Sequence, residues 1–220
     1  MRKIFSAISL FIVCSYSFAQ KDTSKNMSWG TVHKGILAGV GTISVGEMPA
    51  FNITNAYITG NLEYYAQRNV SIRGDAFFFV NSLTQNSPLV RNSGIYFGAF
   101  YHFNTHSGFD PLIGFQPGWS VTKMTAQNDL SPPALTNSYK DATSLCPLAS
   151  VVVGFNFFAE KWFHIQANVR YTAGQYLAPS SQGGVFADQN NISELSFSFG
   201  LGFNIDVFPR RRGPAGNPSF

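Results

Sequence analysis

The chain has few charged residues, few cysteines and no long run of apolar residues. Charged residues make up 12% of its 220 positions, about half the share that is usual in a soluble domain. The longest apolar run is far short of the roughly 20 residues that a membrane-spanning helix requires, so no transmembrane helix is predicted. Hydrophobic residues nevertheless reach 45% and aromatic residues 15% of the chain. These apolar residues must therefore belong to structure other than a membrane-spanning helix.

The N-terminal segment 1–19 has the pattern of a secretory signal, with a basic start, a short apolar stretch and small residues before Gln20. A membrane anchor is the alternative interpretation, but the apolar stretch is too short to span a bilayer. Cleavage removes Cys14 and leaves Cys146 alone, which excludes an intramolecular disulfide in the exported chain. Cleavage also lowers the formal net charge from +4 to +2. A nearly neutral body predicts no nucleic-acid partner.

Large apolar residues occupy every second position near the C-terminus, and the residues between them are small or polar. Period two indicates a β-strand and not a helix. The apolar positions of this strand are Leu195, Phe197, Phe199, Leu201, Phe203, Ile205 and Val207.

Eight segments of the chain have strand character, and the connections between them alternate in length. The predicted strands are 34–45, 57–67, 70–80, 94–103, 109–121, 148–158, 163–174 and 192–208. Short hairpin turns follow the second, fourth and sixth strands. Long polar loops follow the others, at 46–56, 81–93, 122–147 and 175–191. Short turns at one end and long loops at the other are typical of bacterial outer-membrane barrels.

One face of the predicted strands is apolar, and the opposite face carries the charges. An eight-stranded barrel has an interior just wide enough for side chains, so the bulky faces would overfill it. Placing these faces against lipid solves the problem, and the sheet must then close because unpaired backbone groups are costly in hydrocarbon. The sequence therefore predicts an all-β, eight-stranded antiparallel up-and-down transmembrane β-barrel. Aromatic residues near strand ends are predicted to form interfacial girdles: Tyr57, Trp119, Trp162 and Tyr171.

The last strand ends at Phe208, with hydrophobic residues three, five, seven and nine positions before it: Ile205, Phe203, Leu201 and Phe199. With the alternating meander over 34–208, this strand resembles those of the small outer-membrane barrels of the OmpA and OmpX type. The resemblance implies a barrel in the outer membrane of a Gram-negative bacterium, surrounded by outer-membrane lipid. It also implies a partner during biogenesis, the barrel-assembly machinery, which reads the last strand as an assembly signal.

The segments outside the predicted barrel are short. Residues 20–33 are predicted to form a periplasmic N-terminal segment, and residues 209–220 a flexible basic tail because they are rich in proline, glycine and arginine. No folded periplasmic domain fits in this tail, so the cell-wall anchoring of two-domain relatives is not carried over.

The predicted polar faces place Glu63, Arg73 and Asp75 inside the barrel. Counting across the hairpin between the second and third strands puts Glu63 opposite Arg73, where side chains lie close enough for an ion pair. Buried charges must be paired. We therefore predict an interior salt-bridge plug, joined by Arg170. A gated ion path is the alternative.

The sequence offers no evident catalytic or metal site. A lipid-acting hydrolase needs a nucleophile, a histidine base and an orienting carboxylate. Of the four histidines, His102 and His164 are predicted to face inward near the turn end, and none of the four has evident serine and acid partners at the extracellular lipid face, where a lipid A deacylase would work. No cofactor is predicted, because neither metal-ligand spacing nor a phosphate-binding glycine motif is present.

We therefore predict a non-enzymatic outer-membrane barrel with a side-chain-filled interior and a structural or surface-interaction role. Its long extracellular loops would carry any recognition surface, because binding residues concentrate on loops held by a rigid scaffold. A narrow small-solute channel is the second interpretation, and a lipid-modifying enzyme is the third.

Overall fold

The structure, a computed structural model, describes residues 35–50, 52–67, 69–85, 87, 89–103, 105, 108–124, 143–160, 162–175 and 191–206. The predicted export signal, the segment 20–33, Phe208 and the C-terminal tail lie outside the described residues. Within the described part, no helix is long and apolar enough to cross a membrane.

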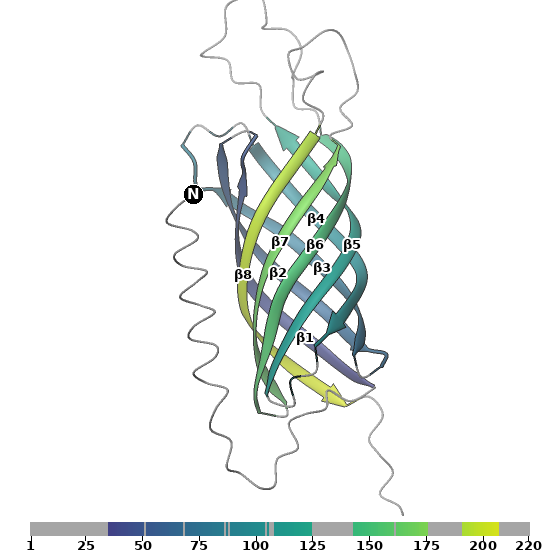
Figure 1. Cartoon of the computed structure of the whole chain (residues 1–220). Helices are drawn as coiled ribbons and strands as arrows, with labels where there is room; N and C mark the ends of the chain where they lie inside the picture. The colour runs from purple at the N-terminus through teal and green to yellow at the C-terminus, as the bar shows by residue number, and fades with distance from the viewer. Residues whose placement is uncertain are drawn as a thin grey trace, which may run out of the picture.

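Eight antiparallel strands form a closed barrel in which each strand pairs with its neighbours in sequence (Figure 1). Pairing of the last strand with the first closes the cylinder, from Ile36↔Asp206 to Glu47↔Leu195. The predicted fold class is therefore confirmed. The strands are β1 (Ile36–Met48), β2 (Ile53–Tyr65), β3 (Val70–Ser82), β4 (Leu89–His102), β5 (Phe109–Met124), β6 (Thr143–Glu160), β7 (Phe163–Gln175) and β8 (Asn191–Asp206).

The two ends of the barrel differ in their connections. At one end, here called the turn end, the strands are joined by residues 66–69, 103–108 and 161–162. At the opposite end, the loop end, the longest connections are residues 125–142 and 176–190. The predicted long loops 46–56 and 81–93 are wrong, because most of their residues belong to strands.

The pairing of β1 with β2 explains the first of these errors. The ladder continues to Met48↔Ile53, so that only residues 49–52 connect the two strands. Asn52 has a φ of 51°, a left-handed conformation that asparagine tolerates better than most residues. Similarly, β3 runs to Ser82 and β4 begins at Leu89. The polar residues in these stretches therefore belong largely to strands, and their composition does not mark loops.

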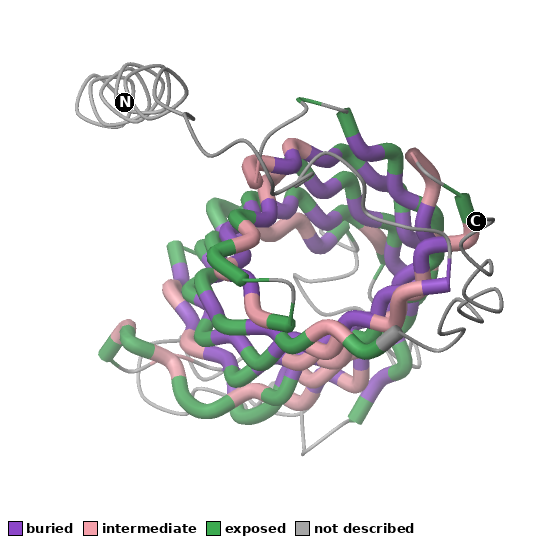
Figure 2. The backbone as a smooth tube through the Cα atoms, turned by 90° about the horizontal axis from the view of Figure 1, so that it is seen from below, coloured by how far each residue is buried: buried purple, intermediate pink, exposed green. Residues whose placement is uncertain are grey.

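Alternate residues along each strand point into the barrel and out of it, which Figure 2 shows as alternating buried and exposed segments. The outward residues include large apolar side chains such as Ile43, which is 71% exposed, and Phe97, which is 64% exposed. The inward face is predominantly polar, but it carries an apolar cluster near the loop end. The buried members of this cluster are Met48, Ile53, Tyr57, Phe77, Leu89, Tyr96, Cys146, Leu148 and Ile192.

The inward cluster corrects one predicted position. Tyr57 is only 2% exposed and packs inside the barrel, so it is not a girdle residue. Its position along β2 has the same parity as the inward-facing Asn61 and Glu63. Trp119, Trp162 and Tyr171 are each more than half exposed on the outer surface.

Candidate functional site: the barrel interior

The four charged residues predicted to lie inside the barrel are all buried there: Glu63, Arg73, Asp75 and Arg170. Glu63 is the direct cross-strand partner of Arg73, in agreement with the counting across the hairpin. The closest ion pairs are different from the predicted one. Arg73 Nε lies 2.9 Å from Asp75 Oδ1, while Glu63 contacts His102.

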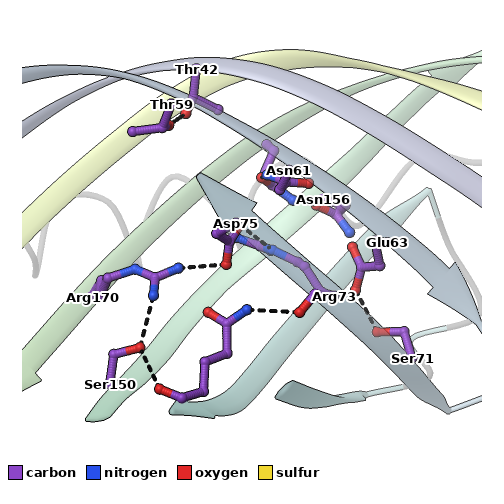
Figure 3. A network of polar contacts seen from close by, with 12 residues as sticks. Thr42, Thr59, Asn61, Glu63, Ser71, Arg73, Asp75, Ser150, Asn156 and Arg170 are labelled. Carbon is purple, nitrogen blue, oxygen red and sulfur yellow. Dashed lines mark hydrogen bonds and ion pairs between the residues drawn. The ribbon is translucent and has the colours of Figure 1, made fainter. Parts of the chain in front are cut away.

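Backbone register alone did not decide the ion pairs because the side chains are long. Arg73 turns along its own strand toward Asp75, two residues further on. Asp75 also accepts a hydrogen bond from Arg170 Nη2 at 2.6 Å. The carboxylate of Asp75 therefore lies between two guanidinium groups (Figure 3). We call Arg73, Asp75 and Arg170 the central triad.

Neutral groups complete the surroundings of the central triad. Arg170 Nη1 donates to Ser150 Oγ at 2.8 Å, and its guanidinium carbon lies 4.7 Å from the ring centroids of both Phe77 and Tyr96. Arg73 lies over the ring of Phe100 in a similar way, at 4.6 Å. Such cation–π contacts favour a desolvated cation. The two arginines are therefore held by aromatic surface as well as by Asp75.

A second polar cluster lies toward the turn end, and we call it the histidine cluster. His102 Nδ1 is 2.8 Å from Asp110 Oδ2, and His102 Nε2 is 2.9 Å from Ser71 Oγ. Ser71 Oγ donates to Glu63 Oε1 at 2.5 Å, and Glu63 Oε1 is also 3.1 Å from His102 Nε2. These four residues come from four consecutive strands, β2 to β5, so the cluster joins half of the barrel wall.

His102 has serine and acid partners inside the barrel toward the turn end, away from the extracellular lipid face to which the prediction refers. Ser71, His102 and Asp110 have the hydrogen-bond distances of a nucleophile, a base and an orienting acid. Glu63 changes the chemistry of this arrangement, because the single hydroxyl proton of Ser71 is directed to Glu63 and not to His102. Both ring nitrogens of His102 then face acceptors, which leaves no lone pair to receive the serine proton.

Sequence reasoning missed the histidine cluster, although register counting could have found part of it. His102 ends β4 and Asp110 follows the start of β5, and both have inward parity across a predicted hairpin. Counting would thus have placed both side chains on the inward face, although the ladder pairs His102 with Leu112 and not with Asp110. His164 also lies inside, fully buried. His33 and His106 lie outside the described residues.

Near the loop end, Glu194 lies in a small polar cavity. The cavity occupies about 10 Å³, close to the space that one water molecule needs. Asn92 Nδ2 donates to Tyr57 Oη at 3.0 Å and lies 3.4 Å from Glu194 Oε2. Arg170 forms part of the same wall. This space admits a water molecule, and it is too small for an organic substrate.

The described residues contain no group of three or more His, Cys, Asp or Glu side chains placed to hold a metal ion. Cys146 is a fully buried free thiol near the loop end. Its sulfur lies 3.7 Å from Thr122 Oγ1. The environment of Cys146 is thus that of a packed core residue.

The apolar residues of the predicted assembly signal that the structure describes lie on the outer face of β8. They are Phe199, Leu201, Phe203 and Ile205, each about half exposed. Phe203 also contacts Trp162 and Phe163 near the turn end, with ring centroids 6.0 and 5.9 Å apart. Phe208 lies outside the described residues.

A closed meander with charges inside and apolar side chains outside is the architecture of a transmembrane β-barrel. No protein-family model matches the chain, and no curated protein matches it. Solved structures do share its fold. The N-terminal β-barrel domain of Pseudomonas aeruginosa OprF is 13% identical, with 78% of this chain and 98% of that domain covered and a TM-score of 0.51.

Two further solved barrels have similar values. Neisserial surface protein A is 13% identical, with 78% of this chain and 96% of that protein covered and a TM-score of 0.53. The outer membrane protein OprG from Pseudomonas aeruginosa is 14% identical, with 81% and 99% covered and a TM-score of 0.50. Sequence identities of 13–14% establish a shared fold. They confirm the resemblance predicted from the sequence for the fold.

Proposed function

We propose that this protein is an outer-membrane barrel with an occluded interior. The barrel holds the loops between its strands at the cell surface. Its role is structural or a surface interaction, and residues 125–142 and 176–190 are the segments that it presents outside the cell. The orientation follows that of bacterial barrels, whose short turns face the periplasm.

The inverted distribution of polarity is the observation that carries this proposal. Phe97, Phe199 and Leu201 are exposed outside the barrel, while Arg73, Asp75 and Arg170 are buried inside it. Exposed apolar surface of this extent marks a contact with membrane or protein. The closed sheet also leaves no edge strand, as hydrocarbon demands.

The packed interior argues against a conducting pore. The central triad joins β3 to β7 across the lumen, and apolar side chains fill the space nearer the loop end. The cavity beside Glu194 accommodates about one water molecule. A solute would have to separate buried ion pairs in order to pass, which costs several kcal/mol.

Fractionation and gel migration test the membrane assignment. We expect the full-length chain, expressed in a Gram-negative host, to separate with outer-membrane markers. It should also migrate differently on SDS gels before and after boiling, because a folded barrel resists the detergent. Recovery as a detergent-free periplasmic monomer would refute the proposal.

The same preparation tests the occluded interior. Purified protein inserted into planar bilayers should give no stepwise ion conductance, and neither should Arg73→Ala. A conductance that appears or rises in Arg73→Ala would support the gated ion path instead.

Surface presentation has a separate test on intact cells. An epitope inserted within 125–142 should be accessible to antibody without permeabilisation. The same epitope inserted at Trp162, in a connection of the turn end, should become accessible only after permeabilisation. The reverse result would invert the orientation that we propose.

We also propose that β8 and the residues after it form the assembly signal read by the barrel-assembly machinery. Support comes from the outward row that ends in Phe203 and Ile205. Phe208→Ala should lower the folded amount in cells at least severalfold and leave refolding of the purified chain in detergent unchanged. Phe197→Ala, outside the pattern of offsets, is the matched control. Equal loss in both variants would contradict the role of Phe208.

A further inference from the structure

The hydrogen-bonded ladder between β3 and β4 ends before the two strands do. Its last cross-strand pair toward the loop end is Phe77↔Gly94. Residues 78–82 of β3 and residues 89–93 of β4 continue as strands, but they form no pair with each other in the described part of the chain. We call these two segments the open seam. Below the seam the strands are paired, so the barrel itself is closed.

A β-bulge in each of the two strands accounts for their separation. On β3, Val80 is the extra residue opposite β2, in the register shift between Ala56 and Tyr57. On β4, Val90 is the extra residue opposite β5. Bulges bend a strand and increase its local twist. One bulge lies on each side of the seam, so β3 follows β2 and β4 follows β5 where the two strands part.

Both sides of the seam are held in place by these other neighbours. β3 stays paired with β2 as far as Ser82, and the N–H of Leu83 then donates to the carbonyl of Thr54 at 2.7 Å. β4 stays paired with β5 as far as Leu89. Each side of the seam is therefore a strand edge that is already extended and bonded along its opposite edge.

The backbone groups that would continue the ladder have no strand partner across the seam. The N–H of Phe79 donates at 3.3 Å to the side-chain hydroxyl of Ser93 and not to a backbone carbonyl of β4, and the ladder offers no pair beyond this point. Unpaired backbone groups are costly in hydrocarbon. The seam therefore belongs outside the hydrocarbon, at the cell surface in the orientation proposed above.

The residues of β3 beside the seam are apolar and exposed. Phe78, Val80 and Leu83 are each more than half exposed, and no charged residue occurs within 78–82. Natural edge strands are usually protected by charges or by proline, and this edge has neither. By contrast, β6 carries Pro147 directly beyond the end of its ladder with β7.

We propose that the open seam binds an uncharged, extended peptide segment of another extracellular protein, which adds as a strand to the edge of β3 at 78–82. A peptide strand satisfies backbone N–H and C=O groups and also covers apolar side chains, whereas water does only the first and an acyl chain only the second. A charged partner residue would lose water here without gaining a counter-ion. A strand of this length covers much less than the roughly 1,000 Å² of a stable interface, so the contact is transient.

A second copy of the chain in the same membrane does not fit this edge. Antiparallel pairing of two identical edges requires a two-fold axis perpendicular to the sheet. The barrel wall stands across the membrane, so this axis would lie in the membrane plane and one barrel would be upside down. Parallel pairing requires an axis along the strand, and strands tilted by about 35–45° would then incline one barrel strongly against the other.

Binding of a synthetic peptide to the purified, folded full-length protein in detergent tests the seam. The probe is a short fluorescent peptide of alternating threonine and valine, blocked at both ends, and the readout is fluorescence anisotropy. We expect the protein to bind it at least about tenfold more tightly than the same peptide methylated on every backbone nitrogen, which keeps its side chains but cannot donate ladder hydrogen bonds. Equal affinity for the two peptides would indicate adsorption to apolar surface and would overturn the proposal.

A lysine placed on the edge should block the seam. Val80→Lys should weaken binding of the unmethylated peptide at least about fivefold, because a charge on an edge strand opposes strand addition. Glu47→Lys is the matched control and should leave the affinity unchanged, since Glu47 is exposed near the loop end on a strand that is paired on both sides. Migration of unboiled samples verifies folding, and Asn81→Lys replaces Val80→Lys if that variant fails to fold. Unchanged affinity in the folded edge variant would refute the site.

Hydrogen exchange shows where the peptide binds. The bound peptide should slow the exchange of backbone amides in 78–82 and leave those in 143–147 of β6 unchanged. Protection of 143–147 instead would place the peptide on β6 and contradict the proposal. Chemical cross-links between two copies of the protein that disappear in Val80→Lys would identify a second copy as the occupant, and they would contradict it as well.

This inference rests on the proposed function only for access to the seam from outside the cell. The peptide assay uses purified protein, so its result is independent of cell fractionation. A protein that binds the peptide and yet fractionates away from the outer membrane would refute the proposed function without removing the site. An outer-membrane protein that does not bind the peptide would refute the site alone.

Discussion

Arg170 on β7 donates a hydrogen bond to Asp75 on β3 at 2.6 Å, although these strands are not neighbours in the sheet. The contact therefore crosses the lumen. Asp75 also binds Arg73 on its own strand, so a single carboxylate neutralises parts of two guanidinium groups. This bridge is the clearest reason to regard the interior as a closed, packed core, and it makes Asp75 the residue on which the interior depends most.

Loss of the Asp75 carboxylate should destabilise the barrel strongly. Asp75→Asn leaves Arg73 and Arg170 buried without their shared counter-ion, which costs about 3–5 kcal/mol when one partner of a buried pair is removed. Urea unfolding in lipid vesicles, followed by gel migration, measures this loss. Glu47→Gln, which alters an exposed charge on the outer face, should change the free energy of unfolding by less than about 0.5 kcal/mol. Similar values for the two variants would show that the bridge contributes little.

Replacing a glycine by alanine should affect the free energy of unfolding differently on the two faces of the barrel wall. A Cβ added to the inward-facing Gly98 would lie 2.8 Å from Gln116 Cα and 2.9 Å from Gln116 Cγ, so β4 and β5 would have to separate. We expect Gly98→Ala to lower the free energy of unfolding by about 1–3 kcal/mol.

The outward-facing Gly41 is the matched control for Gly98. A Cβ at Gly41 meets no atom within 4 Å, and alanine lowers the entropy of the unfolded chain. Gly41→Ala should therefore be neutral or stabilising by up to about 1 kcal/mol. If the two variants unfold at the same urea concentration, the close approach of β4 and β5 at Gly98 is not important for stability.

Cys146 should be protected from thiol reagents while the barrel is folded. Its side chain is fully buried, and its sulfur contacts Thr122 and the carbonyl of Ser144. A charged maleimide should label it only after unfolding in urea. Thr143→Cys, placed in a Cys146→Ser background at an exposed position of the same strand, should react at once. Rapid labelling of Cys146 in the folded protein would indicate a water-filled route past the apolar cluster.

Ser71 should not act as a nucleophile. Its hydroxyl proton is directed to Glu63 Oε1, and the side chain is fully buried. A fluorophosphonate probe, which reacts with activated serines, should not label the folded protein. Labelling of the wild type that disappears in Ser71→Ala would instead identify Ser71, His102 and Asp110 as a working catalytic triad.

The sequence predicts the barrel well because the alternation of apolar and polar residues along the strands describes most of it. Alternation separates the outward Phe199 and Leu201 from the inward Arg170 and Asp75. In the first strand, glycines blur the alternation, and the sequence does not show which face points outward. Strand ends were less certain. Polar residues near Met48 and Ile53 were interpreted as loop, although they continue the ladder.

The contacts inside the barrel were only partly accessible from the sequence. Counting across a hairpin placed Glu63 opposite Arg73 correctly, because register within a hairpin depends on the turn between the strands. The same count could not show that Arg73 turns to Asp75, since a long side chain reaches several positions from one Cα. Nor could it show that Val90 forms a bulge, which depends on the packing of Leu89 and Asn92 inside the wall.

The sequence by itself determined the number of strands and, except in the first strand, which residues share a face, because these properties follow from local alternation and from the need to pair every backbone group in hydrocarbon. Only the tertiary structure decided which buried groups meet. Closing β8 onto β1 sets the width and stagger of the cylinder. Those two quantities place Asp75 within reach of Arg170, and Ser71 within reach of His102 and Glu63.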